Sequence, residues 1–210
     1  MSGIDDLLAE SNDRWSRARR NAQDVEDLGM GKAVKTYYIR YFPAGVLVLT
    51  AAGTVVGLLI FGGTPSGWVS YLLFGFVLAA FGSLIGGLIY DAKKVAPLAR
   101  LPRVDVLFPL EGEERKQINR QIAGKSPIDG EHVSVARAGA VQQRKGLARL
   151  LLMLPSNLFL FTSLAANWAG REDPFVWVML IAVALSIVGV VFLMRDFRRT
   201  TRFLTTTSEE

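Results

Sequence analysis

The chain has 210 residues, of which 50% are hydrophobic and 20% are charged, and its formal net charge is +5. Cysteine is absent, which excludes disulfides, thiolate metal sites, iron–sulfur clusters and cysteine nucleophiles. Four apolar runs are each long enough to cross a hydrocarbon core of about 30 Å, which predicts an all-α integral membrane protein and not one soluble domain. The runs cover residues 42–63, 68–90, 147–169 and 175–194.

Lysine and arginine are distributed very unevenly between the apolar runs. Residues 1–41 hold seven, residues 91–149 hold twelve and residues 195–210 hold four, whereas the two other loops hold only Arg171. Because the basic residues of short loops stay on the cytoplasmic side, we expect a multi-pass protein of the cell (inner) membrane with both termini in the cytoplasm. The predicted parts are a cytoplasmic N-terminal region (1–41), a transmembrane hairpin (42–90), a cytoplasmic segment (91–146), a second transmembrane hairpin (147–194) and a cytoplasmic tail (195–210).

The N-terminal region predicts an amphipathic helix over residues 4–25, because apolar residues recur there at helical spacing. Residues 1–28 carry seven acidic residues and four arginines, a balance that disfavours simple adsorption to anionic lipid. We expect the face of Leu7, Leu8 and Trp15 to bind a partner protein or the central segment instead. Residues 29–32 should interrupt the helix before the first membrane span.

Small residues at four-residue spacing mark the first membrane hairpin. Gly82 and Gly86 form one such pair in the second helix, and Gly53 and Gly57 form another in the first. Such pairs let helix backbones approach closely in lipid. We expect packing within one molecule, with a homo-oligomer interface as the alternative.

The central segment predicts a cytoplasmic helical hairpin. Residues 97–109 contain three prolines and should be extended, whereas residues 111–123 should form a helix that ends at Gly124. A second helix should begin at Ser126 or Asp129 and end near Lys145. Basic residues are not interleaved with aromatic ones here, so we expect no nucleic-acid partner.

The third membrane run contains the most polar residues. Pro155 cannot donate a backbone hydrogen bond, so it should kink the helix and leave a carbonyl group free inside the membrane. Ser156 and Asn157 could bond that carbonyl, join two helices or line a polar site. His132 is the only histidine and has no metal-ligand spacing around it, so we expect no metal, cofactor or catalytic site.

Taken together, these features favour a non-enzymatic accessory or scaffold protein that binds a partner in the membrane or at its cytoplasmic face. One alternative is a small channel or facilitator formed by self-association, with Asn157 near the pathway. Another is an enzyme acting on lipid at the membrane surface, for which spacing reveals no acid, base or nucleophile. Residues 205–208 should form a disordered tail.

Overall fold

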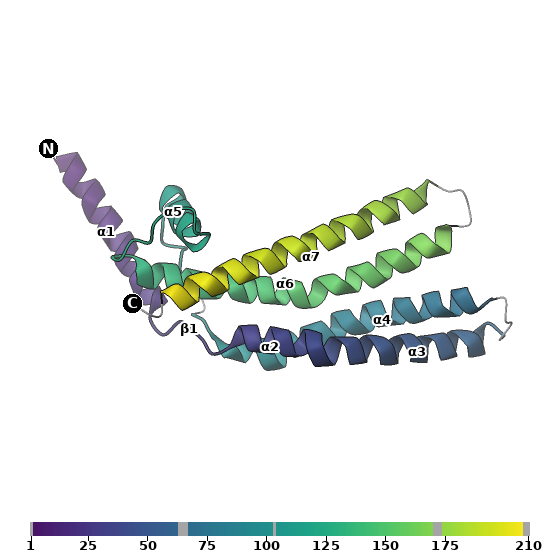
Figure 1. Ribbon diagram of the computed structural model, residues 1–210. Helices are drawn as coiled ribbons and strands as arrows, with labels where there is room; N and C mark the ends of the chain where they lie inside the picture. The colour runs from purple at the N-terminus through teal and green to yellow at the C-terminus, as the bar shows by residue number, and fades with distance from the viewer. Residues whose placement is uncertain (1, 63–66, 103, 170–173, 208–210) are drawn as a thin grey trace. The chain divides into compact units, whose positions relative to one another are not determined.

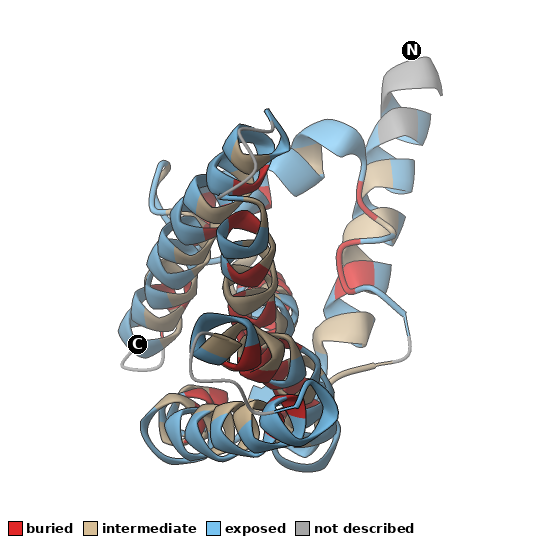
Figure 2. Ribbon diagram, turned by 90° about the vertical axis from the view of Figure 1, so that its right-hand side faces the viewer, coloured by how far each residue is buried: buried red, intermediate tan, exposed pale blue. Residues whose placement is uncertain are grey.

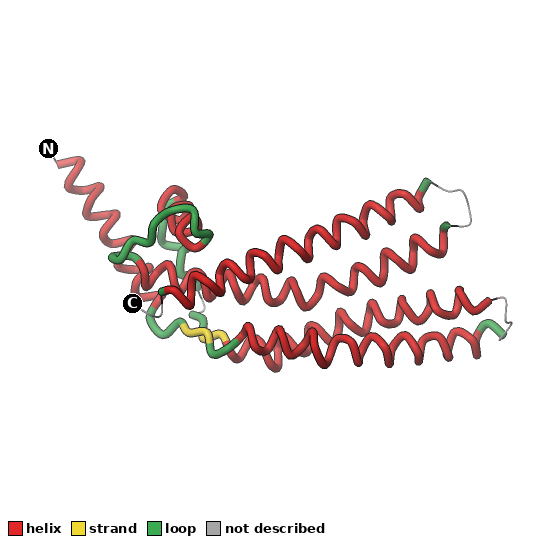
Figure 3. The backbone as a smooth tube through the Cα atoms, viewed as in Figure 1, coloured by secondary structure: helices red, strands yellow, loops and turns green. Residues whose placement is uncertain are grey.

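The computed structural model describes residues 2–62, 67–102, 104–169 and 174–207 (Figure 1). It is 82% helical and has four helices long and apolar enough to span a membrane, which confirms the prediction of a helical fold with four such helices. The candidate spans are Met30–Ile60, Trp68–Leu98, Val133–Trp168 and Phe175–Thr206. The described residues also include a short antiparallel pair of strands that was not predicted, β1 (Glu26–Asp27) and β2 (Ala99–Arg100), drawn in yellow in Figure 3.

The chain divides into two compact units, each made of separate stretches of sequence. Unit 1 comprises Met1–Met30, Ala96–Leu147 and Arg195–Glu210, and unit 2 comprises Gly31–Val95 and Ala148–Met194. Unit 1 therefore combines three segments of the chain. Two candidate spans lie between the first and second segments, and the other two lie between the second and third.

In unit 1, α1 (Ser2–Ala22) and α5 (Gly112–Ile122) pack against the polar ends of two long helices, which cover Val133–Trp168 and Phe175–Thr206. Helix α1 ends three residues earlier than predicted, because Asp24 adopts a left-handed conformation with φ 64°. Helix α5 matches the predicted helix closely, and Gly124 with φ 67° follows its end. The core is formed by Ala18, Val106, Leu107, Leu110, Ile118, Ile122, Val135, Ala136, Ala138, Ala140 and Phe203.

The first pair of membrane helices is longer than the apolar runs that predicted them. Helix α2 (Met30–Thr36), a π-helical turn (Tyr37–Tyr41) and α3 (Phe42–Ile60) follow one another without a break. The predicted interruption at residues 29–32 is therefore confined to Gly29, whose φ is 107°. Helix α4 (Trp68–Tyr90) continues into a second π-helical turn, Asp91–Val95, so polar residues prolong both helices beyond the apolar stretch.

The two remaining helices also pass through the predicted boundaries. Helix α6 (Val133–Trp168) runs without interruption through the predicted helix end near Lys145, so the second helix of the central segment and the third apolar run form one helix. Helix α7 (Phe175–Thr206) includes most of the predicted tail, and Thr205 and Thr206 are helical and not disordered. Residues 195–206 contain no proline or glycine, and Phe203 is buried in unit 1, so nothing ends the helix at the last apolar residue.

Candidate functional sites

Helix α1 is held within unit 1 by Trp15 and Arg14. The Trp15 Nε1 group donates to Glu114 Oε1 at 3.1 Å, and the indole ring packs edge-on against His132 with 3.6 Å between ring centroids. Arg14 reaches the carboxylates of Glu10 on its own helix and of Glu111 and Glu114, with its Nη1 atom 3.0 Å from Glu111 Oε1. These contacts attach the N-terminal helix to α5 and to the residues preceding α6.

The predicted partner-binding face is therefore partly occupied by the chain itself. Trp15 is packed against the core of unit 1, whereas Leu8 is 59% exposed. The side chain of Leu7 lies outside the described residues. Binding of another protein by this face stays a prediction. Of its residues with a described side chain, Leu8 is the exposed one.

Glu114 joins α1 to the start of α5, and its ionisation depends on that contact. Burial raises the pKa of Glu114, but hydrogen bonds and the nearby positive charge together lower it by more than burial raises it. The pKa of Glu114 therefore lies below its ordinary value. The Glu111 backbone N–H donates to Glu114 Oε2 at 2.8 Å, and Ser11 Oγ donates to Glu114 Oε1 at 3.2 Å. The Arg14 guanidinium supplies the neighbouring positive charge, at 3.5 Å.

We expect unit 1 to lose stability in acid through Glu114. A carboxyl group whose folded-state pKa is lowered contributes stability above its unfolded pKa and loses that contribution as pH falls through the folded pKa. The melting temperature in detergent, followed from neutral pH to about pH 3, should fall less steeply in Glu114→Gln than in the wild type. Parallel profiles for the two proteins would contradict this role.

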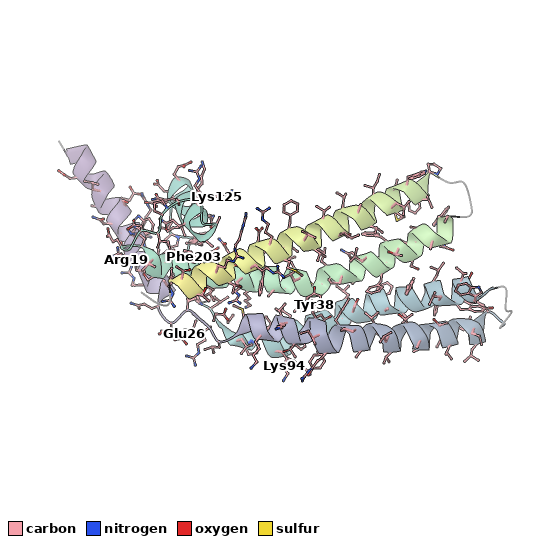
Figure 4. All side chains as sticks on the ribbon, in the orientation of Figure 1. Arg19, Glu26, Tyr38, Lys94, Lys125 and Phe203 are labelled. Atoms are coloured by element: carbon pink, nitrogen blue, oxygen red, sulfur yellow. The ribbon has the colours of Figure 1, made fainter. Side chains whose placement is uncertain are left out.

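A second polar contact forms in unit 2, where Pro155 interrupts the hydrogen bonds of α6. Proline at this position leaves the carbonyl of Leu151 without its helical donor. Tyr38, from the first π-helical turn, donates its hydroxyl to Leu151 O at 2.5 Å (Figure 4). The freed carbonyl was predicted, but the donor is a tyrosine from another helix and not the neighbouring Ser156 or Asn157.

Ser156 and Asn157 occupy ordinary positions on α6. Ser156 is buried and donates to Met153 O of its own helix at 2.6 Å. Asn157 is half-buried, and its side chain has no hydrogen-bond partner in the described part of the chain. A polar membrane site at these residues therefore remains a prediction.

Replacing Tyr38 with phenylalanine should leave the Leu151 carbonyl unpaired. We expect a loss of about 1–2 kcal/mol in unfolding free energy, measured by denaturant titration in micelles. Tyr41→Phe removes the same atom from an exposed tyrosine and serves as the control. Adding Pro155→Ala to Tyr38→Phe restores a backbone donor for the carbonyl, so the double variant should recover much of the loss. Equal stability of the two tyrosine variants would disprove the assignment.

Gly82 and Gly86, the glycine pair predicted to pack helices, have different surroundings. A Cβ atom at Gly82 would lie 2.1 Å from Leu49 Cδ1 on α3, so this position packs helix against helix. A Cβ atom at Gly86 would meet nothing within 4 Å. The backbones of α3 and α4 approach closely at Gly53 and Gly75, where a Cβ atom at Gly53 would lie 2.7 Å from Gly75 Cα.

Two of the cavities lined by described residues lie wholly within unit 2. One, of about 360 Å³, includes Gly82 and Gly86 in its wall and has Lys93 and Lys94 at one end. The other, of about 550 Å³, includes Ser163, which donates its hydroxyl to Leu73 O at 3.0 Å. Neither wall includes Pro155, Ser156 or Asn157, so the predicted polar residues of α6 do not line either cavity.

Unit 1 carries a basic face on α5 that was not predicted. Exposed cations from the helix and the residue after Gly124 surround a shallow depression of about 310 Å³: Arg115, Lys116, Arg120 and Lys125 (Figure 4). Phe108 is 70% exposed, and its carbonyl accepts a hydrogen bond from Arg115 Nη2 at 3.4 Å. The helical spacing of the cations could have revealed this face, but exposure of Phe108 depends on the fold.

Among the residues that the structure describes, no three acidic or histidine side chains are grouped to hold a metal ion. No family model, curated protein or solved structure matches the chain. Function is therefore inferred from the residues and contacts of the two units.

Proposed function

We propose that this chain is a non-enzymatic accessory or scaffold protein of the cell (inner) membrane, which holds a partner protein on unit 1. The observation that carries the proposal is the exposed basic face of α5, together with an exposed aromatic residue, Phe108, whose carbonyl accepts a hydrogen bond from Arg115 of that face. Aromatic and arginine side chains are enriched in protein interfaces, where they supply contact area and directed hydrogen bonds. The complementary partner surface is acidic, with an apolar pocket for Phe108.

The composition of unit 1 supports a cytoplasmic location for this surface. Its three segments are separated by pairs of candidate spans, so four crossings would leave all three on one side of the membrane. Nearly all lysines and arginines outside the apolar runs belong to this side, which supports a cytoplasmic location for unit 1 and for both termini. The two transmembrane pairs then anchor the unit, and very short loops face outward.

The proposal is tested by native mass spectrometry of the full chain, purified from its own membranes in mild detergent. We expect a stoichiometric second protein with the wild type and its loss from Phe108→Asp with Arg120→Glu. Leu8→Asp makes a comparable change at another exposed apolar residue of unit 1 and should retain the partner.

Each outcome has a defined meaning. Loss of the partner from Leu8→Asp alone would move the binding surface to α1. The absence of any second protein from the wild type, also after mild crosslinking in intact membranes, would overturn the accessory function.

A further inference from the structure

The smaller cavity of unit 2 has the two-part chemistry of an amphiphile site. Its wall is built from the first π-helical turn, α3, α4 and the second π-helical turn, all within unit 2. Most of the wall is apolar, and Phe42, Val46 and Leu49 contribute to it from α3. Its volume of about 360 Å³ falls at the lower end of the range for small-molecule pockets.

Glycines on opposite walls create the space. Gly45 on α3 and Gly86 on α4 both line the cavity, and a Cβ atom at either position would meet nothing within 4 Å. At Gly82, one turn from Gly86, the space beside the glycine is by contrast occupied by the Leu49 side chain. The open volume therefore lies along the apolar helices and does not result from loose packing of the whole α3–α4 interface.

The other end of the cavity is cationic. Lys93 and Lys94 lie directly after the apolar stretch of α4, and both are exposed; Lys94 is labelled in Figure 4. Within the described residues, neither ammonium group forms an ion pair. The adjacent carboxylate, Asp91, has its Oδ2 atom 3.9 Å from Arg149 Nε on α6. Two positive charges therefore remain for a ligand.

We infer that this cavity binds one anionic phospholipid, with an acyl chain between Gly45 and Gly86 and the phosphate at Lys93 and Lys94. The order of the two chemistries along the helices matches that of a membrane leaflet, because apolar residues are followed by lysines where α4 leaves its apolar stretch. Basic residues at this boundary attract anionic lipid headgroups. A free phosphate would use the lysines alone, whereas a phospholipid would use both the lysines and the apolar wall, so a lipid fits the whole site better.

The test uses the full chain reconstituted in vesicles containing equal amounts of phosphatidylglycerol and phosphatidylcholine. After extraction in mild detergent, native mass spectrometry counts the lipids retained by each protein. The wild type should retain one phosphatidylglycerol in preference to phosphatidylcholine. Lys93→Gln with Lys94→Gln should reduce that preference by roughly tenfold or more, because each lysine near a membrane surface contributes separately to anionic-lipid binding.

A matched charge control is available in the same unit. Lys32→Gln with Lys35→Gln removes two exposed lysines of α2 that do not line the cavity, and it should keep the wild-type preference. Gly86→Leu should fill the apolar part and abolish retention of either lipid. Gly45→Leu tests the same volume from α3, so that misfolding of one variant does not decide the result; circular dichroism checks both.

Three results would overturn the inference. The first is equal retention of the two lipids by the wild type. The second is unchanged retention in both the double-lysine variant and a correctly folded glycine variant. The third is displacement of the lipid by millimolar inorganic phosphate, which would assign the lysines to a free anion. The partner on unit 1 plays no part in these measurements, so they do not depend on the accessory function.

Discussion

Gly75→Ala should severely destabilise the pair formed by α3 and α4. A Cβ atom at this position would lie 2.5 Å from Thr50 O and 2.7 Å from Thr54 Oγ1. The first of these atoms belongs to the backbone, so the helices themselves must separate to relieve the contact. Figure 1 shows α3 and α4 side by side, and Figure 2 shows buried residues interspersed with exposed ones along the helices. We expect a cost of about 1–3 kcal/mol for alanine and more for leucine.

The measurement is the unfolding free energy in mixed micelles, compared across a series of glycine variants. Gly82→Ala should cost less than Gly75→Ala, because the obstructing atom is the end of the Leu49 side chain and can rotate away. Gly86→Ala meets no atom and should be neutral or slightly stabilising, since alanine favours the helix. Equal stability of the Gly75 and Gly86 variants would show that α3 and α4 do not pack in this way.

These glycines show how far sequence patterns reach in this protein. The small-residue spacing identified helices that approach closely, but Gly82 and Gly86 share that spacing and have different neighbours. Which glycine is tight depends on the rotation and crossing point of both helices, and these are set by many side chains together. Length and hydropathy, by contrast, report on each helix separately, which is why four helices able to cross a membrane were predicted correctly.

The helix ends and the polar contacts illustrate a second limit. Hydropathy locates the end of an apolar stretch, but α6 and α7 continue beyond it because their polar residues still favour helix and Phe203 packs in unit 1. The free carbonyl near Pro155 followed from covalent chemistry alone. Its donor, Tyr38, lies more than one hundred residues away, and no local pattern identifies such a partner.

Arg144→Met should be the most damaging single change in unit 1. Arg144 Nη1 forms an ion pair with Asp27 Oδ2, and the two side chains are only 10% and 11% exposed. The guanidinium carbon also lies 4.9 Å from the centroid of the Phe197 ring, so one side chain links α6 with β1 and α7. Removing it leaves the Asp27 carboxylate buried without its counter-ion, for which we expect a loss of about 3–5 kcal/mol.

Asp27 has a second task that the variants can separate from the first. Its Oδ1 atom accepts hydrogen bonds from the backbone N–H groups of Gly29 at 2.9 Å and Met30 at 2.8 Å, at the start of α2. Asp27→Asn keeps an oxygen for these donors and removes only the charge. Combining Asp27→Asn with Arg144→Met should therefore cost less than the sum of the two single changes, because the double variant has no unpaired buried charge.

An exposed ion pair in the same unit provides the control. Arg17 Nη2 lies 2.9 Å from Asp13 Oδ2 on α1, and both side chains are more than half exposed. Arg17→Met should change the unfolding free energy by less than about 1 kcal/mol, because solvent screens the pair. Thermal unfolding and limited proteolysis of the full chain in detergent distinguish the two positions. If Arg144→Met were no more damaging than Arg17→Met, or if the double variant were simply additive, the Asp27–Arg144 pair would not hold α6 to β1.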